Sequence, residues 1–125
     1  MSSVGLAQRI EWIESGYEYL LAYAAQGRRD DEGSEVRRTL SQMQVALDGL
    51  GEEIQKSFAA GSSGTNGAAF LEAAGHDART AQGAIALVLS CPVIPSLLID
   101  NLNASIHLRA VLTDLFLIDQ ALKAV

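Results

Sequence analysis

The residues best suited to chemistry lie in one short stretch of this chain, between positions 70 and 80. It holds His76, one of two histidines, with Asp77 directly after it and Thr80 one helical turn later. A neutral imidazole is an available nucleophile at neutral pH. An adjacent carboxylate can hold its tautomer and take its ring proton while the imidazole attacks phosphorus. The spacing therefore predicts a histidine that accepts a phosphoryl group and passes it on.

This stretch resembles the H-box of sensor histidine kinases, in which a phenylalanine, five residues, the histidine, an acid, any residue, arginine, threonine and proline follow one another. The residues that match this order and spacing are Phe70, His76, Asp77, Arg79 and Thr80. Ala81 stands where the family usually has proline, so we expect the helix to lack the usual kink there.

The resemblance implies a role for each matching residue near the histidine. His76 would be the phosphoryl acceptor and Asp77 the acid that serves it. Thr80 occupies the place of the threonine that, in the family, helps to position water for dephosphorylation of the response regulator. Arg79 either holds a phosphoryl oxygen or, more simply, pairs with Glu72 or Asp77.

A second likeness to the same family lies near the C-terminus. Residues 108–118 read Leu-Arg-Ala-Val-Leu-Thr-Asp-Leu-Phe-Leu-Ile, similar to the end of the second helix of the dimerisation and phosphotransfer hairpin. The resemblance covers residues 70–119 and implies a receiver domain of a response regulator as the partner. No asparagine or glycine box of an ATP-binding domain follows. We therefore expect a phosphotransferase module without a cofactor of its own, and Mg²⁺ and ATP would act only through a partner or a missing domain.

These residues must be positioned by helices, because apolar residues recur every three or four positions and no β-alternation is sustained. The sequence predicts an all-α fold, a four-helix bundle or two helical hairpins, antiparallel and up-and-down. The first helix is expected at about residues 4–26. Ser34 is the expected N-cap of a second, continuous helix whose apolar stripe runs from Val36 to Ile54. Pro92 should end the third helix, and a fourth, continuous helix is expected from Pro95 to the C-terminus. The expected units are an N-terminal hairpin at 1–60, a Gly/Ser linker at 61–67 and a phosphotransfer hairpin at 68–125.

The register of the third predicted helix, residues 68–90, decides where the histidine points. Its inward positions are predicted to be Leu71, Ala74, Ala78, Ala81, Ile85 and Val88. His76 then lies on the opposite, solvent-facing side, where a phosphoryl donor or acceptor can reach it. Small residues nearby, among them Ala73, Gly75 and Gly83, would leave room for the active site of a partner.

The last predicted helix is apolar over much of its circumference. One stripe consists of Leu108, Val111, Leu115, Ile118 and Leu122. Leu112, Phe116 and Leu117 lie outside this stripe and would form an exposed patch if nothing covered them. This breadth fits either a central core helix or a dimer face, and we expect a homodimer. Residues 1–60 could instead complete a bundle within one chain.

Composition excludes several other classes of partner and site. The net charge is −6 and no basic run occurs, so nucleic acid is not an expected partner. A single cysteine, Cys91, rules out an internal disulfide, and no signal peptide is visible, so we expect a cytoplasmic protein. Residues 80–99 carry no charge, but Pro92 and Pro95 interrupt them. We therefore expect a buried hairpin corner and no membrane insertion.

Two alternatives to phosphotransfer follow from the same residues. Glu72 and His76 stand at i and i+4 and could form half of a metal site, but no second helix supplies a matching Glu-x-x-His pair, so no metal is expected. The other alternative is a non-catalytic helical interaction module that keeps the kinase-like hairpin as a docking surface.

Overall fold

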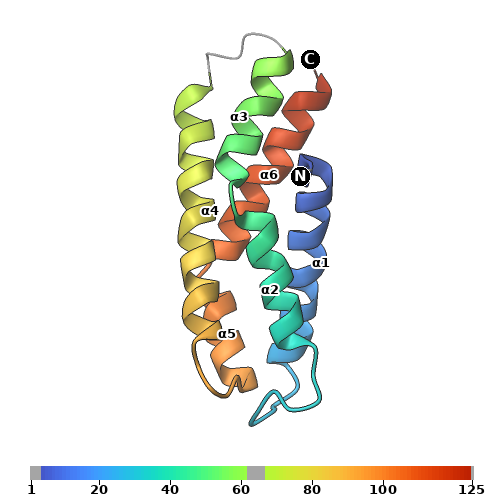
Figure 1. The fold of residues 1–125 in the computed structure, drawn as a ribbon, viewed down its shortest axis with the longest axis vertical. Coiled ribbons are helices and arrows are strands. Elements are labelled where there is room, and N and C mark those ends of the chain that lie inside the picture. Colours follow the sequence, from blue (N-terminus) through green and yellow to red (C-terminus); the bar gives the residue numbers. More distant parts are fainter. Residues whose placement is uncertain (1–3, 62–66, 125) are drawn as a thin grey trace.

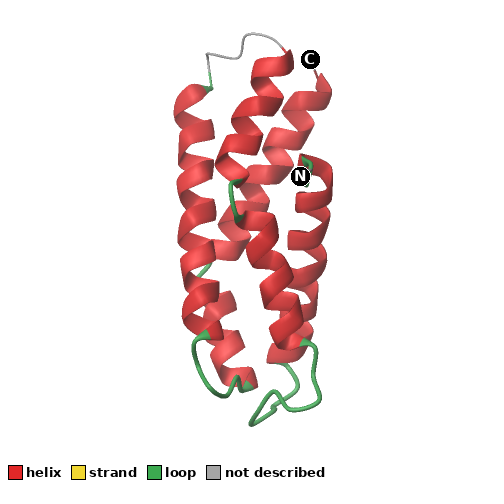
Figure 2. Cartoon of the chain, in the orientation of Figure 1, coloured by secondary structure: helices red, strands yellow, loops and turns green. Residues whose placement is uncertain are grey.

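The chain is all-helical in a computed structural model that describes residues 4–61 and 67–124. Its helices are α1 (Leu6–Ala24), α2 (Val36–Leu47), α3 (Leu50–Gly61), α4 (Ala68–Leu89), α5 (Ser96–Ala104) and α6 (His107–Ala124). The described residues contain no strand (Figure 2). The all-α prediction is therefore confirmed. Most of the predicted linker, residues 62–66, lies outside the described residues.

Two of the predicted helices are each interrupted once. α2 ends at Leu47 and α3 begins at Leu50, and α5 ends at Ala104 before α6 begins at His107. Figure 1 shows α3 continuing the line of α2, and α6 the line of α5. The expectation of one continuous helix in each place is therefore wrong.

The break between α2 and α3 depends on a glycine and a buried arginine. Asp48 is extended, with ψ 122°, and Gly49 has φ +71°, which glycine adopts without steric cost. The Arg9 side chain is only 7% exposed. Its guanidinium donates to the carbonyls of Ala46, at 3.1 Å, and of Asp48, while its Nε donates to the carbonyl of Val4 at 2.7 Å. Carbonyls that the end of α2 leaves without helical partners are thus satisfied.

The break between α5 and α6 contains no glycine or proline, the residues that usually predict a helix break. Ile106 takes φ +65°, which costs a β-branched residue roughly 1–2 kcal/mol. Its amide donates to the carbonyl of Asn103 at 3.2 Å, and its own carbonyl accepts from Ala110 at 2.8 Å. The end of one helix and the start of the next are therefore held by local hydrogen bonds that the sequence pattern does not reveal.

Buried side chains of all six helices form one continuous core. α1 packs on α2 and α5, whereas α4 packs on α2, α3 and α6. The inward positions predicted for α4 are all buried: Leu71, Ala74, Ala78, Ala81, Ile85 and Val88. This register is confirmed, and it determines where every side chain of the H-box stretch points.

Two predictions about burial are wrong. Leu112 is buried within the chain, so α6 needs no second copy to cover it, although Phe116 and Leu117 are exposed. The uncharged segment 80–99 is not buried throughout: Ile85, Ile94 and Ile99 are buried, whereas Leu87 is 70% exposed and Leu97 68%. Both leucines lie on the outward faces of their helices. The segment therefore lacks charged residues on its exposed face as well as on its buried face.

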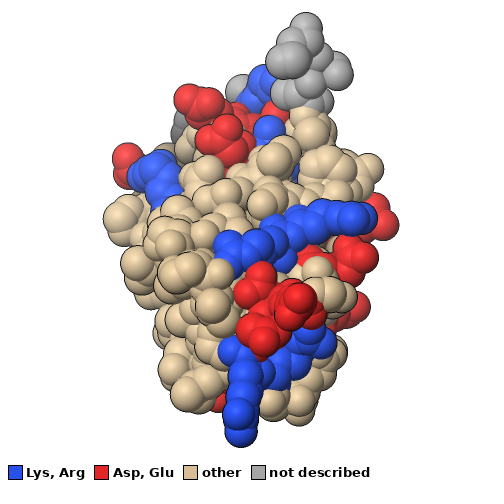
Figure 3. Space-filling model, turned by 60° about the horizontal axis from the view of Figure 1, so that its bottom comes forward, with Lys and Arg blue, Asp and Glu red and all other residues tan. Residues whose placement is uncertain are grey.

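Figure 3 views the molecule from the end where the α1–α2 and α4–α5 connections lie, which we call the loop end (residues 25–35 and 90–95). Acidic and basic side chains interleave over part of this view, and a broad uncharged surface occupies the rest. Among the helices of residues 4–61 and 67–124, none has both the length and the apolarity that crossing a bilayer requires.

The loop end is held together by polar side chains that reach between its two segments. The Tyr23 hydroxyl donates to the carbonyl of Ile94 at 2.6 Å, and the Ser96 hydroxyl donates to the carbonyl of Tyr23 at 2.7 Å. The backbone amide of Ile94 donates to the carboxylate of Asp31 at 2.8 Å. These bonds join the N-terminal and C-terminal halves of the chain.

Arg37 completes this network. Its Nε contacts the Asp31 carboxylate at 2.8 Å, and its other nitrogens donate to the carbonyls of Leu89, Cys91 and Pro92 at 2.8–3.2 Å. The arginine thereby caps the C-terminal end of α4, where carbonyls have no helical partner. Hydrogen bonds from Ile94 and Arg37 hold the pKa of Asp31 below its usual value.

Candidate functional site

The predicted site residues all lie on α4, but they point to three different sides of it. His76 is exposed on the outer face, opposite the buried stripe. Ala73 and Gly83 are exposed as well, and a side chain added at Gly83 would meet nothing within 4 Å. The imidazole is therefore accessible, as the register predicted, and its surroundings on this face are small.

Thr80 is engaged with the helix backbone. Its hydroxyl donates to the carbonyl of His76 at 3.1 Å, the usual back-bond of a threonine to the residue four positions earlier. The hydroxyl is thus held beside the histidine residue, although its bond is to the main chain and not to the imidazole. A hydroxyl in this position retains two lone pairs with which to accept a hydrogen bond.

Asp77 turns toward α6 and meets another acid, Asp114. Burial, with the neighbouring Asp77 carboxyl as a further cause, raises the pKa of the Asp114 carboxyl to about 7. The Oδ2 atom of Asp114 is buried and has no hydrogen-bond partner among the described residues. The acid expected to serve His76 is therefore also part of a carboxyl pair at the α4–α6 interface.

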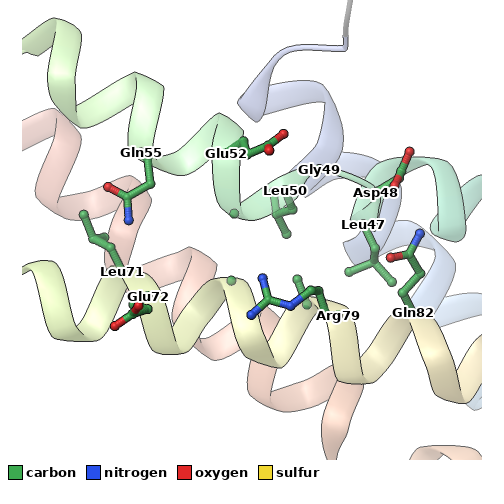
Figure 4. A pocket seen from close by; sticks show the side chains of 13 residues that line it. Leu47, Asp48, Gly49, Leu50, Glu52, Gln55, Leu71, Glu72, Arg79 and Gln82 are labelled. Carbon is green, nitrogen blue, oxygen red and sulfur yellow. The ribbon is translucent and has the colours of Figure 1, made fainter.

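Arg79 and Glu72 lie on the other side of α4, along a groove toward α2 and α3. The groove has a volume of about 690 Å³ and passes the break between α2 and α3. In Figure 4 the guanidinium of Arg79 lies between α4 and α3, while the carboxylates of Asp48 and Glu52 point away from α4. Among the described residues, Arg79 forms no ion pair, so the expected pairing with Glu72 or Asp77 is absent.

Two glycines bring α3 and α4 together at the floor of this groove. A Cβ placed on Gly51 would lie 3.1 Å from the Cα of Gly75, and one placed on Gly75 would lie 3.3 Å from the Cα of Gly51 and 3.7 Å from Nη1 of Arg79. Gly75 is therefore a helix contact, and not room for a partner as the sequence suggested.

Sequence reasoning missed Asp114 and the groove. Asp114 lies directly before the buried Leu115 of α6, and none of the residues three or four positions from it is basic. An acid at the edge of a buried stripe with no cation three or four residues away was the available signal. The groove had no signal in the sequence, since it depends on where α2 stops and on the approach of Gly51 to Gly75.

No three His, Cys, Asp or Glu side chains gather into a metal site within the part of the chain that the structure describes. Comparison of the chain with protein-family models, with curated proteins and with solved structures gave no significant match. The function is therefore inferred from the residues of α4 and their surroundings.

Proposed function

We propose that this chain is a histidine phosphotransfer module of two-component signal transduction, in which His76 accepts a phosphoryl group and passes it to an aspartate of a receiver domain. The observation that carries the proposal is the exposure of His76 on the outer face of α4. A phosphoryl group passes between proteins only if both active sites reach the same imidazole. Exposure, small neighbours and a fixed helix register meet that requirement.

The helices divide into four lines that suit such a module. They are α1, α2 with α3, α4, and α5 with α6, and they run alternately up and down in Figure 1. We propose that they form a four-helix bundle within one chain, with the phosphoryl acceptor near the middle of one line. Under this proposal the module acts in the cytoplasm as a homodimer, and the exposed Phe116 and Leu117 meet a second copy.

A phosphorylation assay tests the proposal directly. The full chain is incubated with acetyl phosphate, and separately with a phosphorylated receiver domain. We expect acid-labile phosphohistidine on the wild type, none on His76→Gln, and undiminished labelling on His107→Gln, which removes the other exposed histidine. Light scattering on the same samples should give twice the chain mass if the dimer forms. Labelling that survives His76→Gln, or no labelling from either donor, rejects phosphotransfer through His76.

A second function is favoured by a different observation, the exposed aliphatic surface at the α4–α5 corner. Leu87, Val93 and Leu97 are exposed within eleven residues of chain that carry no charge. A non-catalytic interaction module would use such a surface for docking, and it would not need Asp77 beside the imidazole. Binding of a receiver domain in calorimetry, without any labelling of His76, would support this function over phosphotransfer.

A further inference from the structure

The acid pair at the α4–α6 interface is an arrangement that stable helix packing does not require. Asp77 projects from α4 and Asp114 from α6, and the two helices pack directly against each other. Asp114 is partly buried, and its Oδ2 atom is fully covered without a hydrogen-bond partner. Two ionised carboxylates are acceptors only, so neither can bond the other. One proton between them supplies the missing donor.

No cation compensates this pair within the described residues. The helices that pack on α6 are α1, α3, α4 and α5, and Asp77 is the one group among their charged side chains that acts on Asp114. On α1, Arg9 is bound to backbone carbonyls, and on α3, Glu53 pairs with Lys56 at 3.7 Å. The other charged groups of these four helices are exposed: Glu11, Glu14, Glu18, Glu52, Glu72, His76, Arg79 and Asp100.

The remaining charged groups of α6 are also accounted for. His107 and Arg109 are exposed near its start, and Asp119 pairs with Lys123 at 3.0 Å in its last turns. Two tyrosines of α1 form hydrogen bonds away from Asp114. The Tyr19 hydroxyl accepts from the amide of Glu35, and the Tyr23 hydroxyl donates to the carbonyl of Ile94 at the loop end. The electrostatics of Asp114 are therefore set by burial and by one other acid.

We propose that Asp77 and Asp114 share one proton across the α4–α6 interface and form a pH-sensitive clamp, closed when the proton is held and loosened when it is lost. The clamp does not depend on phosphotransfer, because it requires only the two carboxyls and the packing of the two helices. It lies one residue from His76, so its ionisation also changes the charge beside the imidazole.

The sign of the pH effect follows from the direction of the shift. Burial and Asp77 raise the pKa of Asp114 to about 7 in the folded chain, from an ordinary value of 3.8. Between these values the folded chain holds a proton that the unfolded chain has released. The contribution to stability is therefore complete below about pH 4, declines as the pH rises toward 7, and is lost above that.

Carboxyl carbon NMR on the full chain measures the proton directly. We expect Asp114 to titrate near pH 7 in the wild type and at least about one pH unit lower in Asp77→Asn, whose amide donates to the carboxylate and carries no charge. An ordinary aspartate titration of Asp114 in the wild type would overturn the proposal, whatever the variants do.

Thermal unfolding between pH 5 and 8 tests the consequence for stability. From pH 5 to pH 8 the midpoint temperature of the wild type should fall by about 4–8 °C more than that of Asp114→Asn, because the asparagine cannot gain the second charge. Asp100→Asn removes an exposed acid on α5 and should keep the wild-type profile. Parallel profiles for the wild type and Asp114→Asn would refute the clamp. Because neither measurement uses a phosphoryl donor, failure of the clamp and failure of phosphotransfer are distinguishable.

Discussion

The loop end and the α4–α6 interface each hold a partly buried carboxyl, and they shift its pKa in opposite directions. At the loop end, Asp31 receives a backbone amide and an arginine, and these bonds lower its pKa. Beside the middle of α4, Asp114 of α6 lies next to Asp77 and to no cation among the described residues, and burial raises its pKa to about 7. Both acids lie between segments that are far apart in the sequence. Burial acts to raise the pKa of both carboxyls, and the direction of the net shift depends on whether hydrogen-bond donors or a second acceptor lie beside the acid.

The two regions therefore differ in how their stability should depend on pH. The loop end joins the two halves of the chain through hydrogen bonds whose donors and acceptors are matched. Within the part of the chain that the structure describes, the α4–α6 interface is held chiefly by apolar packing, and the buried Oδ2 atom of Asp114 lacks a hydrogen-bond donor. We expect the loop end to tolerate changes of pH near neutrality and the α4–α6 interface to respond to them.

The largest expected effect comes from removing the Arg37 side chain, which forms most of the charge-assisted bonds at the loop end. Arg37→Met removes the ion pair with Asp31 and the hydrogen bonds that cap the end of α4. It should lower the free energy of unfolding by about 2 kcal/mol. This value is at the low end of the range for several charge-assisted bonds, because the side chain is 38% exposed. Urea denaturation measures the loss.

Arg38→Met provides the matched control for that change. Arg38 is adjacent, its side chain is 82% exposed, and it forms an ion pair with Glu35 at 3.3 Å. Its loss should change the free energy of unfolding by less than about 0.5 kcal/mol. Equal effects of the two substitutions would show that the loop end is not held by the Arg37 network.

A smaller effect, with a definite dependence on pH, is expected at Asp31. Asp31→Asn should lower the free energy of unfolding by about 1–2 kcal/mol at pH 7, because the amide cannot replace both charge-assisted bonds. The pKa of Asp31 is lowered from 3.8, so its contribution is present above that pH and is lost as the pH falls through the lower folded value.

Denaturation at a series of pH values from 7 to 3 measures this dependence. The difference between wild type and Asp31→Asn should narrow below about pH 4, the opposite direction from Asp114. Glu32→Gln, which changes an exposed neighbouring acid, should have little effect throughout. A difference that widens on acidification would contradict the contrast between the two regions.

The smallest expected effect concerns the packing of α4 itself. Gly83→Ala meets nothing within 4 Å and should raise the free energy of unfolding by about 0.5–1 kcal/mol through helix propensity. In Gly75→Ala the same gain is opposed, because the new methyl lies 3.3 Å from the Cα of Gly51 and α3 must shift.

Thermal or urea unfolding of the two glycine variants, side by side with the wild type, measures that contrast. We expect Gly83→Ala to be more stable than the wild type and Gly75→Ala to be no more stable than it. If both substitutions stabilise the chain equally, the close approach of α3 and α4 does not limit the packing of this helix.

Much of the fold could be predicted because helix periodicity is a local property. Apolar spacing located the helices to within a few residues and identified every buried position of α4 except Gly75, and with it the exposure of His76. The breaks at Gly49 and Ile106 were not predicted. A single glycine inside an apolar pattern is also compatible with a continuous helix. Isoleucine in a left-handed conformation is contrary to its intrinsic preference and is imposed by the surroundings.

The sequence by itself determined the helical class, the side of α4 on which His76 lies and the presence of an H-box-like pattern. Each of these depends on residues within a few turns of one another. Tertiary structure alone decided that Asp77 meets Asp114, that Arg79 lies in a groove beside α3, and that Arg9 and Arg37 cap helix ends far from them in sequence. The Asp77–Asp114 pair and the bonds of Arg9 and Arg37 to these helix ends join residues between 37 and 55 positions apart, and no local pattern specifies which distant group a side chain will meet.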